Sequence, residues 1–214
     1  MQAKSDGLDI DVKEFLDPWI LQRNFPVVTV TQNLYNNSVL HVTQERFLLD
    51  PLDKDQDTSR SPYSWTIPLT LASSNHSVFN QTGQDVYWLD KEERSKTLHV
   101  SIPLPNYSDP DGWVLANLHQ YGYYRVNYQD RNWLALIQQL KRNHSAIPVN
   151  NRAQIINDAW SLAKASYISM DIALATLEYL HHELKYTPWY VAWREITLTI
   201  GSKLESTQLG EPFK

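Results

Sequence analysis

Between residues 26 and 128, polar and hydrophobic positions often alternate in short runs rich in β-branched and aromatic residues. A period of two is typical of a strand with one buried face. Turn-forming Asn, Asp, Pro and Gly residues separate seven such runs, which are 26–32, 38–49, 63–72, 85–90, 96–102, 113–118 and 122–128. Seven short strands in about 100 residues predict a β-sandwich.

After Tyr128 the hydrophobic positions recur at helical spacing. Four apolar stripes follow one another, at 133–140, 153–163, 172–184 and 189–200. Residues that favour helix starts precede them, namely Asp130, Asn150, Ser169, and Thr187 followed by Pro188. The short connections predict antiparallel helical hairpins. The expected fold class is therefore α+β in sequence order: a seven-strand sandwich, then a helical-hairpin array that begins a HEAT/armadillo-like domain.

Residues 8–22 also show helical spacing, but Pro18 falls where a helix interior would lose a hydrogen bond. We predict a short helix that ends near Asp17, or one that is kinked there.

Composition excludes several classes of function. The chain has 214 residues, 42% of them hydrophobic, and a net charge of −5, so it lacks the basic surplus that nucleic-acid binding needs. It contains no cysteine, which excludes internal disulfides, thiolate zinc sites and cysteine nucleophiles. No apolar run is long enough for a membrane helix, and residues 1–15 do not resemble a signal peptide.

Five Asn-x-Ser/Thr sequons exceed the roughly two that chance predicts. The candidate N-glycosylation sites are Asn36, Asn75, Asn80, Asn106 and Asn143. All but the last lie in or beside predicted loops, as surface glycans require. The sequons favour a lumenal or extracellular protein, and a chain of that kind without a signal peptide is expected to be part of something longer.

No catalytic, cofactor-binding or metal-ligating constellation is found in the sequence. The nearest string to His-Glu-x-x-His begins at His182-Glu183, but Tyr186 stands where the second histidine is needed. His41 and His99 both lie on alternating strands, so a sheet can bring them together, but nothing in the sequence requires it. Gly-x-Ser-x-Gly and phosphate-binding glycine loops are absent from the sequence.

Aromatic residues are abundant, with 8 Trp and 12 Tyr, and they gather on the predicted strands. Those singled out are Trp65, Tyr87, Trp88, Trp113, Tyr121, Tyr123 and Tyr124. Such residues most often fill a core or an interface between domains. A carbohydrate- or protein-binding face is the alternative.

Several stretches together resemble the mammalian-type aminopeptidase N group of gluzincin zinc aminopeptidases. They are WILQRNFPVVTV (19–30), ERFLLDP (45–51), YSWTIPLTL (63–71), GYYRVNYQDRNW (122–133) and HSAIPVNNRAQIINDAWSLA (144–163). The resemblance implies three parts: residues 1–25 as the helical tail of a missing catalytic domain, 26–128 as a β-sandwich domain, and 129–214 as the first helices of a C-terminal α-helical domain.

The family's Gly-Ala-Met-Glu-Asn motif, its His-Glu-x-x-His motif and its catalytic tyrosine have no matching positions here. The resemblance implies zinc only in a full-length parent, which would hydrolyse N-terminal residues from peptides as an extracellular or plasma-membrane ectodomain and could form a homodimer. Two residues depart from the family pattern. Pro18 replaces a helix-compatible residue, and Asn24 replaces the usual glycine but tolerates the positive φ of a helix-ending turn.

Two hypotheses follow. In the first, the chain is the non-catalytic middle of an aminopeptidase N-like enzyme. In the second, it is a stand-alone inactive relic that binds a peptide, a glycan or a protein. In either case we expect apolar faces to be exposed at both ends of the chain.

Overall fold

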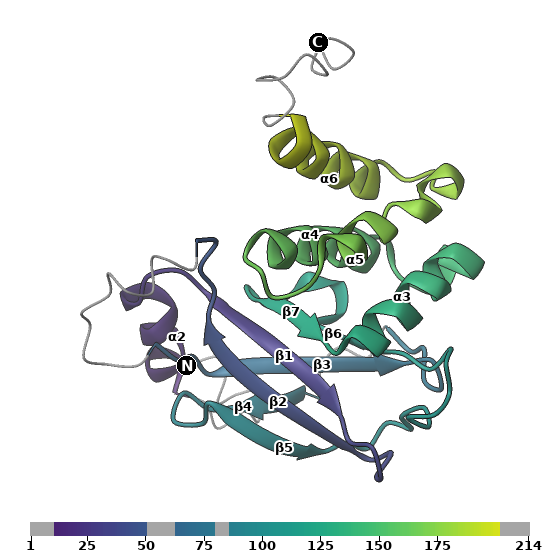
Figure 1. The fold of residues 1–214 in the computed structure, drawn as a ribbon. Helices are drawn as coiled ribbons and strands as arrows, with labels where there is room; N and C mark the ends of the chain where they lie inside the picture. The colour runs from purple at the N-terminus through teal and green to yellow at the C-terminus, as the bar shows by residue number, and fades with distance from the viewer. Residues whose placement is uncertain (1–10, 51–62, 80–85, 202–214) are drawn as a thin grey trace.

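The computed structural model describes residues 11–50, 63–79 and 86–201 (Figure 1). It has both sheets and helices, so the predicted α+β class is confirmed. Seven strands form at the seven predicted places: β1 (Pro26–Gln32), β2 (Val39–Arg46), β3 (Ile67–Ser73), β4 (Val86–Leu89), β5 (Ser95–His99), β6 (Val114–Ala116) and β7 (Arg125–Tyr128).

The strands make two sheets, with the orders β5-β2-β1-β7 and β4-β3-β6. Every pairing is antiparallel except that of β1 with β7, which is parallel and places β7 at a sheet edge. Residues of both sheets enter one shared core. Burial alternates along β3 from Ile67 to Leu71, as period-two patterning predicts, whereas consecutive residues are buried in β6 and β7. Buried Gln44 of β2 joins the layers, because its side-chain amide exchanges hydrogen bonds with the backbone of Trp65, just before β3, at 2.8 and 2.9 Å.

Helices occupy both ends of the described chain. They are α2 (Val12–Leu21), α3 (Asp130–Asn143), α4 (Val149–Lys164), α5 (Met170–Ala175) and α6 (Tyr186–Ile196). Short 3-10 turns occur at Leu118–Gln120, His144–Ala146 and Glu178–His182, and a π-helical turn at Thr197–Gly201. Figure 1 shows α3 to α6 stacked on one end of the sheets, while α2 lies apart beside β3 and β4.

The predicted helix end near Asp17 is wrong, because α2 continues through Pro18 to Leu21. Aromatic anchors on either side of the proline hold the helix against the sheets. The Phe15 ring lies 5.9 Å from that of Trp88, and the Trp19 ring lies 6.1 Å from that of Trp65. These contacts offset the hydrogen bond that the proline ring removes.

Of the predicted helix caps, only Ser169 is confirmed, and its hydroxyl accepts a hydrogen bond from the Ile172 amide at 3.4 Å. Three helices begin one or two residues earlier than predicted, so that Asp130, Asn150 and Pro188 all fall within their first turns. First-turn amides have no intrahelical partner, so a proline is tolerated there and a carboxylate favours the helix dipole.

The third predicted stripe, 172–184, is not one helix. The α5 helix ends at Ala175, where the Thr176 hydroxyl donates to the Ala173 carbonyl at 2.6 Å, and a 3-10 turn follows. Glu183 follows this turn and is buried. The Thr176 hydroxyl bond to the backbone at the end of α5 is a local competitor of the continuous helix that the periodicity predicts.

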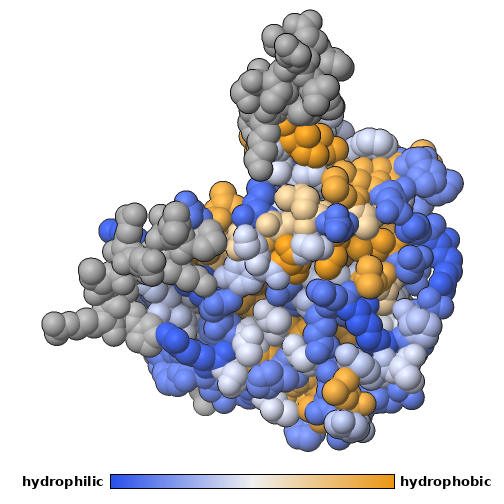
Figure 2. Space-filling view, in the orientation of Figure 1, coloured by the Kyte–Doolittle hydropathy of each residue, from blue (hydrophilic) through white to orange (hydrophobic). Residues whose placement is uncertain are grey.

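Apolar surface is exposed on the first and last described helices, as expected. Ile20 and Leu21 of α2 are 72% and 77% exposed, and Trp193 of α6 is 69% exposed. Figure 2 shows hydrophobic surface over the helical layer.

Asn24 adopts φ = 66°, which confirms the left-handed turn expected between α2 and β1. Its side-chain amide also donates to the Phe47 carbonyl at 3.2 Å. The left-handed region costs an ordinary side chain roughly 1–2 kcal/mol, less for Asn and little for Gly. The direction in which the chain enters β1 therefore depends on this residue.

We predict that Asn24→Ala lowers the free energy of unfolding by about 1–2 kcal/mol, because alanine pays the left-handed penalty and loses the hydrogen bond. Asn24→Gly, the matched control, loses only the hydrogen bond and should cost less. Urea unfolding followed by tryptophan fluorescence compares the two. Equal losses in both variants would contradict the backbone explanation.

Candidate functional site

The glutamate of the His182-Glu183 string has a structural partner. Glu183 is 5% exposed, and its two carboxylate oxygens accept from Nε and Nη2 of Arg152 at 2.6 and 3.1 Å. Burial raises the pKa of Glu183, but Arg152 and the Lys185 amide outweigh it and hold that pKa below its ordinary value. His182 itself is exposed, and its ring lies 3.9 Å from that of His181 at a tilt of 47°. Glu183 is therefore committed to an internal ion pair.

The other histidine pair does share a surface. His41 and His99 point outward from neighbouring strands, β2 and β5, and both are exposed. No third ligand joins them: among the residues that the structure describes, no three His, Cys, Asp or Glu side chains cluster as a metal site would require. The described residues thus do not fit the zinc ion that the family resemblance implies for a parent.

Four of the sequon asparagines lie on the surface, while Asn80 falls outside the described residues. Asn36 and Asn106 sit in tight turns, where their side-chain oxygens accept from the amides of Ser38 and Ser108 at 2.9 and 3.1 Å. Asn75 is exposed beside β3, and Asn143 is the last residue of α3. Their exposure is compatible with glycosylation, which stays a prediction.

The aromatic residues singled out from the sequence divide into three groups. One group, Tyr87 and Trp88 on β4, is half-buried. Trp65, Trp113 and Tyr124 are at most 5% exposed and belong to the core. Tyr121 and Tyr123, by contrast, are each 72% exposed. Both lie in the loop that connects β6 to β7, next to the helices. This loop therefore places exposed aromatic side chains beside the contact between the sheets and the helices.

The loop has an unusual backbone. Asn117, His119 and Gln120 all adopt left-handed φ, at 60°, 56° and 59°. The Asn117 side chain exchanges hydrogen bonds with the backbone of Gly122 at 2.8 and 2.9 Å. Asn151 of α4 fixes the loop from the other side, because it donates to the Asn117 carbonyl and accepts from the His119 amide. Strain of this kind persists only where surrounding contacts over-determine the conformation.

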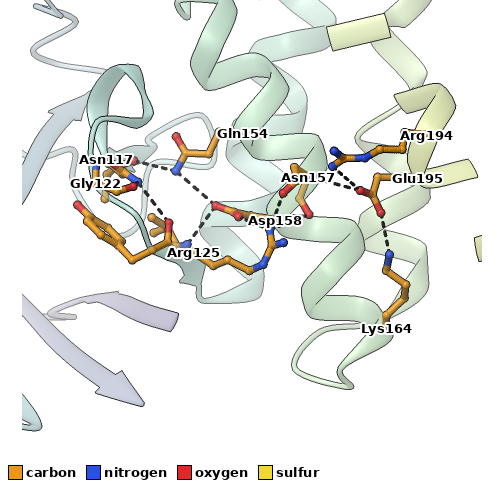
Figure 3. Close-up of polar contacts among 12 residues, drawn as sticks. Asn117, Gly122, Arg125, Gln154, Asn157, Asp158, Lys164, Arg194 and Glu195 are labelled. Atoms are coloured by element: carbon orange, nitrogen blue, oxygen red, sulfur yellow. Dashed lines mark hydrogen bonds and ion pairs between the residues drawn. The ribbon is translucent and has the colours of Figure 1, made fainter. Parts of the chain in front are cut away.

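Asp158 of α4 is the centre of the junction (Figure 3). It is 2% exposed and accepts from the Val126 amide at 3.0 Å, from Nη1 of Arg125 at 2.9 Å and from Nε2 of Gln154 at 3.3 Å. Burial raises its pKa even though Arg125 opposes the shift. The carboxylate thus satisfies a backbone amide on the free edge of β7 and joins that edge to α4.

A second carboxylate extends the network to α6. Glu195 is 3% exposed and accepts from Lys164, Arg194 and Asn157 at 2.7, 3.0 and 3.0 Å. Asn157 in turn accepts from Nη1 of Arg125 at 2.6 Å, so the bonds run without a break from β7 through α4 to α6 (Figure 3). The residues that carry these bonds are called the junction network. They are Arg125, Asn157, Asp158, Lys164, Arg194 and Glu195.

Sequence reasoning missed the junction network. One signal was present, because Asp158 stands between Ile156 and Ala159 within an apolar stripe. A lone carboxylate beside buried positions indicates a buried partner. Neither Arg125 nor Glu195 could be assigned to it without knowing which elements pack together.

An open pocket of about 360 Å³ lies over the junction. It is bounded by the β6–β7 loop, by the start of β1 and by α4. Its lining residues are Phe25, Gln120, Tyr121, Gly122, Tyr123, Tyr124, Arg125, Asn157 and Asp158. The exposed tyrosines therefore share a concave site with three members of the junction network, Arg125, Asn157 and Asp158.

Comparison with known proteins agrees with the resemblance seen in the sequence. Residues 113–214 match the family model of the ERAP1-like C-terminal domain. The chain is 39% identical to human aminopeptidase N over 189 residues, which is 88% of this chain and 18% of that protein. The chain belongs to the aminopeptidase N-like family.

Two further relatives show how the similarity is distributed. The thyrotropin-releasing hormone-degrading ectoenzyme of Rattus norvegicus is 37% identical over 195 residues, or 90% of this chain and 17% of that protein. Aminopeptidase Ey of Gallus gallus is 42% identical over 193 residues, or 90% and 18%. This aminopeptidase N-like chain thus spans less than a fifth of these relatives' length. None of the helices in its described part is long and apolar enough to cross a membrane.

We predict that Asp158→Ala lowers the free energy of unfolding by about 3–5 kcal/mol, because it leaves the Arg125 charge and the Val126 amide without their partner. Asp158→Asn keeps a side-chain oxygen for the Val126 amide and should lose less. Chemical unfolding of both variants is the measurement. A loss below about 1 kcal/mol for alanine would contradict the central role of Asp158.

We predict that the ion pairs of Glu195, which join α4 to α6, are lost at acidic pH. Burial raises its pKa, but Lys164 and Arg194 outweigh burial and hold that pKa below its ordinary value of 4.5. A lowered folded-state pKa means that this stabilisation is present above the ordinary value and is lost as pH falls through the folded value. We expect Glu195→Gln to flatten the fall in stability below about pH 4.5.

The control for this experiment is Asp111→Asn. Asp111 pairs with Arg142, which likewise holds the pKa of that carboxyl low, but the pair is exposed and screened by solvent. The control should leave the pH profile nearly unchanged. Identical profiles for Glu195→Gln and the unmodified chain, measured by thermal unfolding between pH 3 and pH 7, would refute the role of Glu195.

Proposed function

We propose that this chain is the non-catalytic part of an aminopeptidase N-like zinc metalloaminopeptidase, whose parent removes N-terminal residues from peptides. The observation that carries the proposal is the match of 88–90% of the chain to aminopeptidases, over only 17–18% of their length. The one glutamate that follows a histidine as in a zinc-peptidase motif, Glu183, is bound to Arg152. The chain then contributes architecture to a parent whose catalytic residues lie elsewhere.

The proposed division follows the change of pattern along the chain. Residues 1–25 form the helical tail of a preceding catalytic domain, 26–128 the β-sandwich domain, and 129–214 the first helices of a HEAT/armadillo-like C-terminal domain. The two sheets that share a core support the second part. The stacked helices α3 to α6, and the family-model match that begins at residue 113, support the third.

In this role the junction network fixes how the helices sit on the sheets. A buried carboxylate at each step, Asp158 between β7 and α4 and Glu195 between α4 and α6, makes the two attachments directional. Hydrogen bonds to charged groups constrain geometry more strictly than apolar packing does. A parent that uses the helices to limit access to its active site would need such a fixed angle.

The exposed sequons support a further part of the proposal, that the parent is an extracellular or plasma-membrane glycoprotein. Peptides would reach it as substrates through the parent active site, and a homodimer of the parent is part of the same expectation.

The proposal is tested in two arms. The purified 214-residue chain should bind less than about 0.1 equivalent of zinc by elemental analysis and should not hydrolyse alanine p-nitroanilide. In the second arm, the matching segment of human aminopeptidase N is replaced by this chain, and the chimera should retain hydrolysis. A chimera that carries Asp158→Ala, the structural control, should be produced poorly or lose activity.

Stoichiometric zinc together with activity in the chain alone would overturn the non-catalytic assignment. A chimera that folds, binds zinc and has no activity would overturn the architectural role.

A second candidate function is a stand-alone binding module for a peptide, a glycan or a protein. The pocket with its two exposed tyrosines favours it. The gene separates the two candidates, because an open reading frame that continues upstream into His-Glu-x-x-His supports the enzyme part, and an authentic start at Met1 with a stop after Lys214 supports the module.

A further inference from the structure

The guanidinium of Arg125 has an unused edge. Its Nη1 donates to the Asn157 carbonyl, the Asn157 side chain and Asp158 at 3.4, 2.6 and 2.9 Å. Its Nε is buried without an acceptor, and Nη2 makes no hydrogen bond within the described part of the chain. Nε and Nη2 together form the edge that binds a carboxylate through two parallel hydrogen bonds.

The surroundings hold this edge in place. The guanidinium carbon lies 5.6 Å from the centre of the Phe25 ring and 5.1 Å from that of the Phe47 ring. Asp158 fixes the opposite side, and the Arg125 side chain as a whole is only 18% exposed. An arginine that is already immobilised loses little further entropy when it binds a ligand.

The junction network has more cations than carboxylates. Three cations face two carboxylates, Asp158 and Glu195, and a net charge of one positive unit remains within it. One more carboxylate, Glu45, lies outside the network, across Val27 from Arg125 in the same sheet, where it interacts with the hydroxyl of Tyr167. A buried donor without an acceptor is unfavourable, and an incoming carboxylate would supply the missing acceptor.

Aromatic side chains line the pocket beside Arg125. Tyr121 and Tyr123 line it and are each 72% exposed, and the Tyr123 ring lies 5.1 Å from that of Phe25. Aromatic side chains that flank an arginine are typical of sites where a ligand is recognised. The pocket volume is at the lower end of the roughly 300–1,000 Å³ common for small ligands.

We propose that this pocket binds a carboxylate that carries an aromatic or other apolar group. The carboxylate lies on the Nε–Nη2 edge of Arg125, and the apolar group packs between Tyr121 and Tyr123. The chemistry is that of an aromatic acid or of the free carboxyl end of a peptide with an aromatic last residue.

Two probes that differ in charge test the proposal. N-acetyltyrosine and N-acetyltyrosinamide are titrated into the 214-residue chain, and binding is followed by amide NMR shifts of Gly122 and Arg125. We expect the acid to bind at least tenfold more tightly than the amide, because only the acid supplies two charged acceptors. Equal affinities, or no shift of the pocket resonances with the acid at about 20 mM, would overturn the proposal.

Variants of the pocket show which side chains bind the carboxylate of the ligand and which bind its apolar group. Arg125→Lys retains a cation but lacks the planar edge, so it should weaken the acid at least tenfold. Arg142→Lys, on an exposed arginine outside the pocket, is the matched control and should leave binding unchanged. Tyr121→Ala and Tyr123→Ala alter only exposed side chains and should weaken the acid severalfold without loss of fold. Undiminished binding in all three pocket variants would also overturn the site.

A short peptide with tyrosine as its last residue separates the two sources. Binding as tight as that of N-acetyltyrosine assigns the site to peptide ends, and at least tenfold weaker binding restricts it to free aromatic acids. Either result supports the carboxylate edge, provided that the matching C-terminal amide binds more weakly.

Discussion

Asp158 is the residue on which the attachment of helices to sheets depends. A carboxylate in the middle of the apolar face of α4 is costly to bury, and three donors offset that cost: a backbone amide of β7, the Arg125 guanidinium and the Gln154 amide. The donors come from two different layers. The carboxylate is therefore satisfied only when α4 lies at one position along β7.

The consequences of that position extend in both directions. On the sheet side, the free edge of β7 is covered at Val126 by Asp158, so this short parallel strand is not open to pairing with another chain. On the helix side, the Asn157 side-chain amide donates a hydrogen bond to Glu195 and so helps to fix the position of α6. Asn151, also on α4, holds the left-handed β6–β7 loop, and this loop forms one wall of the pocket.

Local chemistry explains which predictions from sequence were right. The seven strands follow from alternation and turn residues, because each depends on a period that a short segment displays by itself. The Asn24 turn and the Ser169 cap are also local, since each involves the backbone of only a few residues. The errors were non-local. Aromatic contacts from distant segments accompany the passage of α2 through Pro18, and Glu183, which follows the interrupted third stripe, is paired with Arg152 of α4.

Sequence alone therefore determined the order of strands and helices, the left-handed turn before β1, the absence of the zinc-peptidase motifs from this chain and its place in the aminopeptidase N-like family. Only the tertiary structure decided which polar residues meet. Arg125 and Asp158 are 33 residues apart, and Lys164 and Glu195 are 31 apart. Neither periodicity nor propensity encodes contacts at such separations, because they arise when α4 packs on β7 and α6. The unused edge of Arg125 becomes visible only after those partners have been placed.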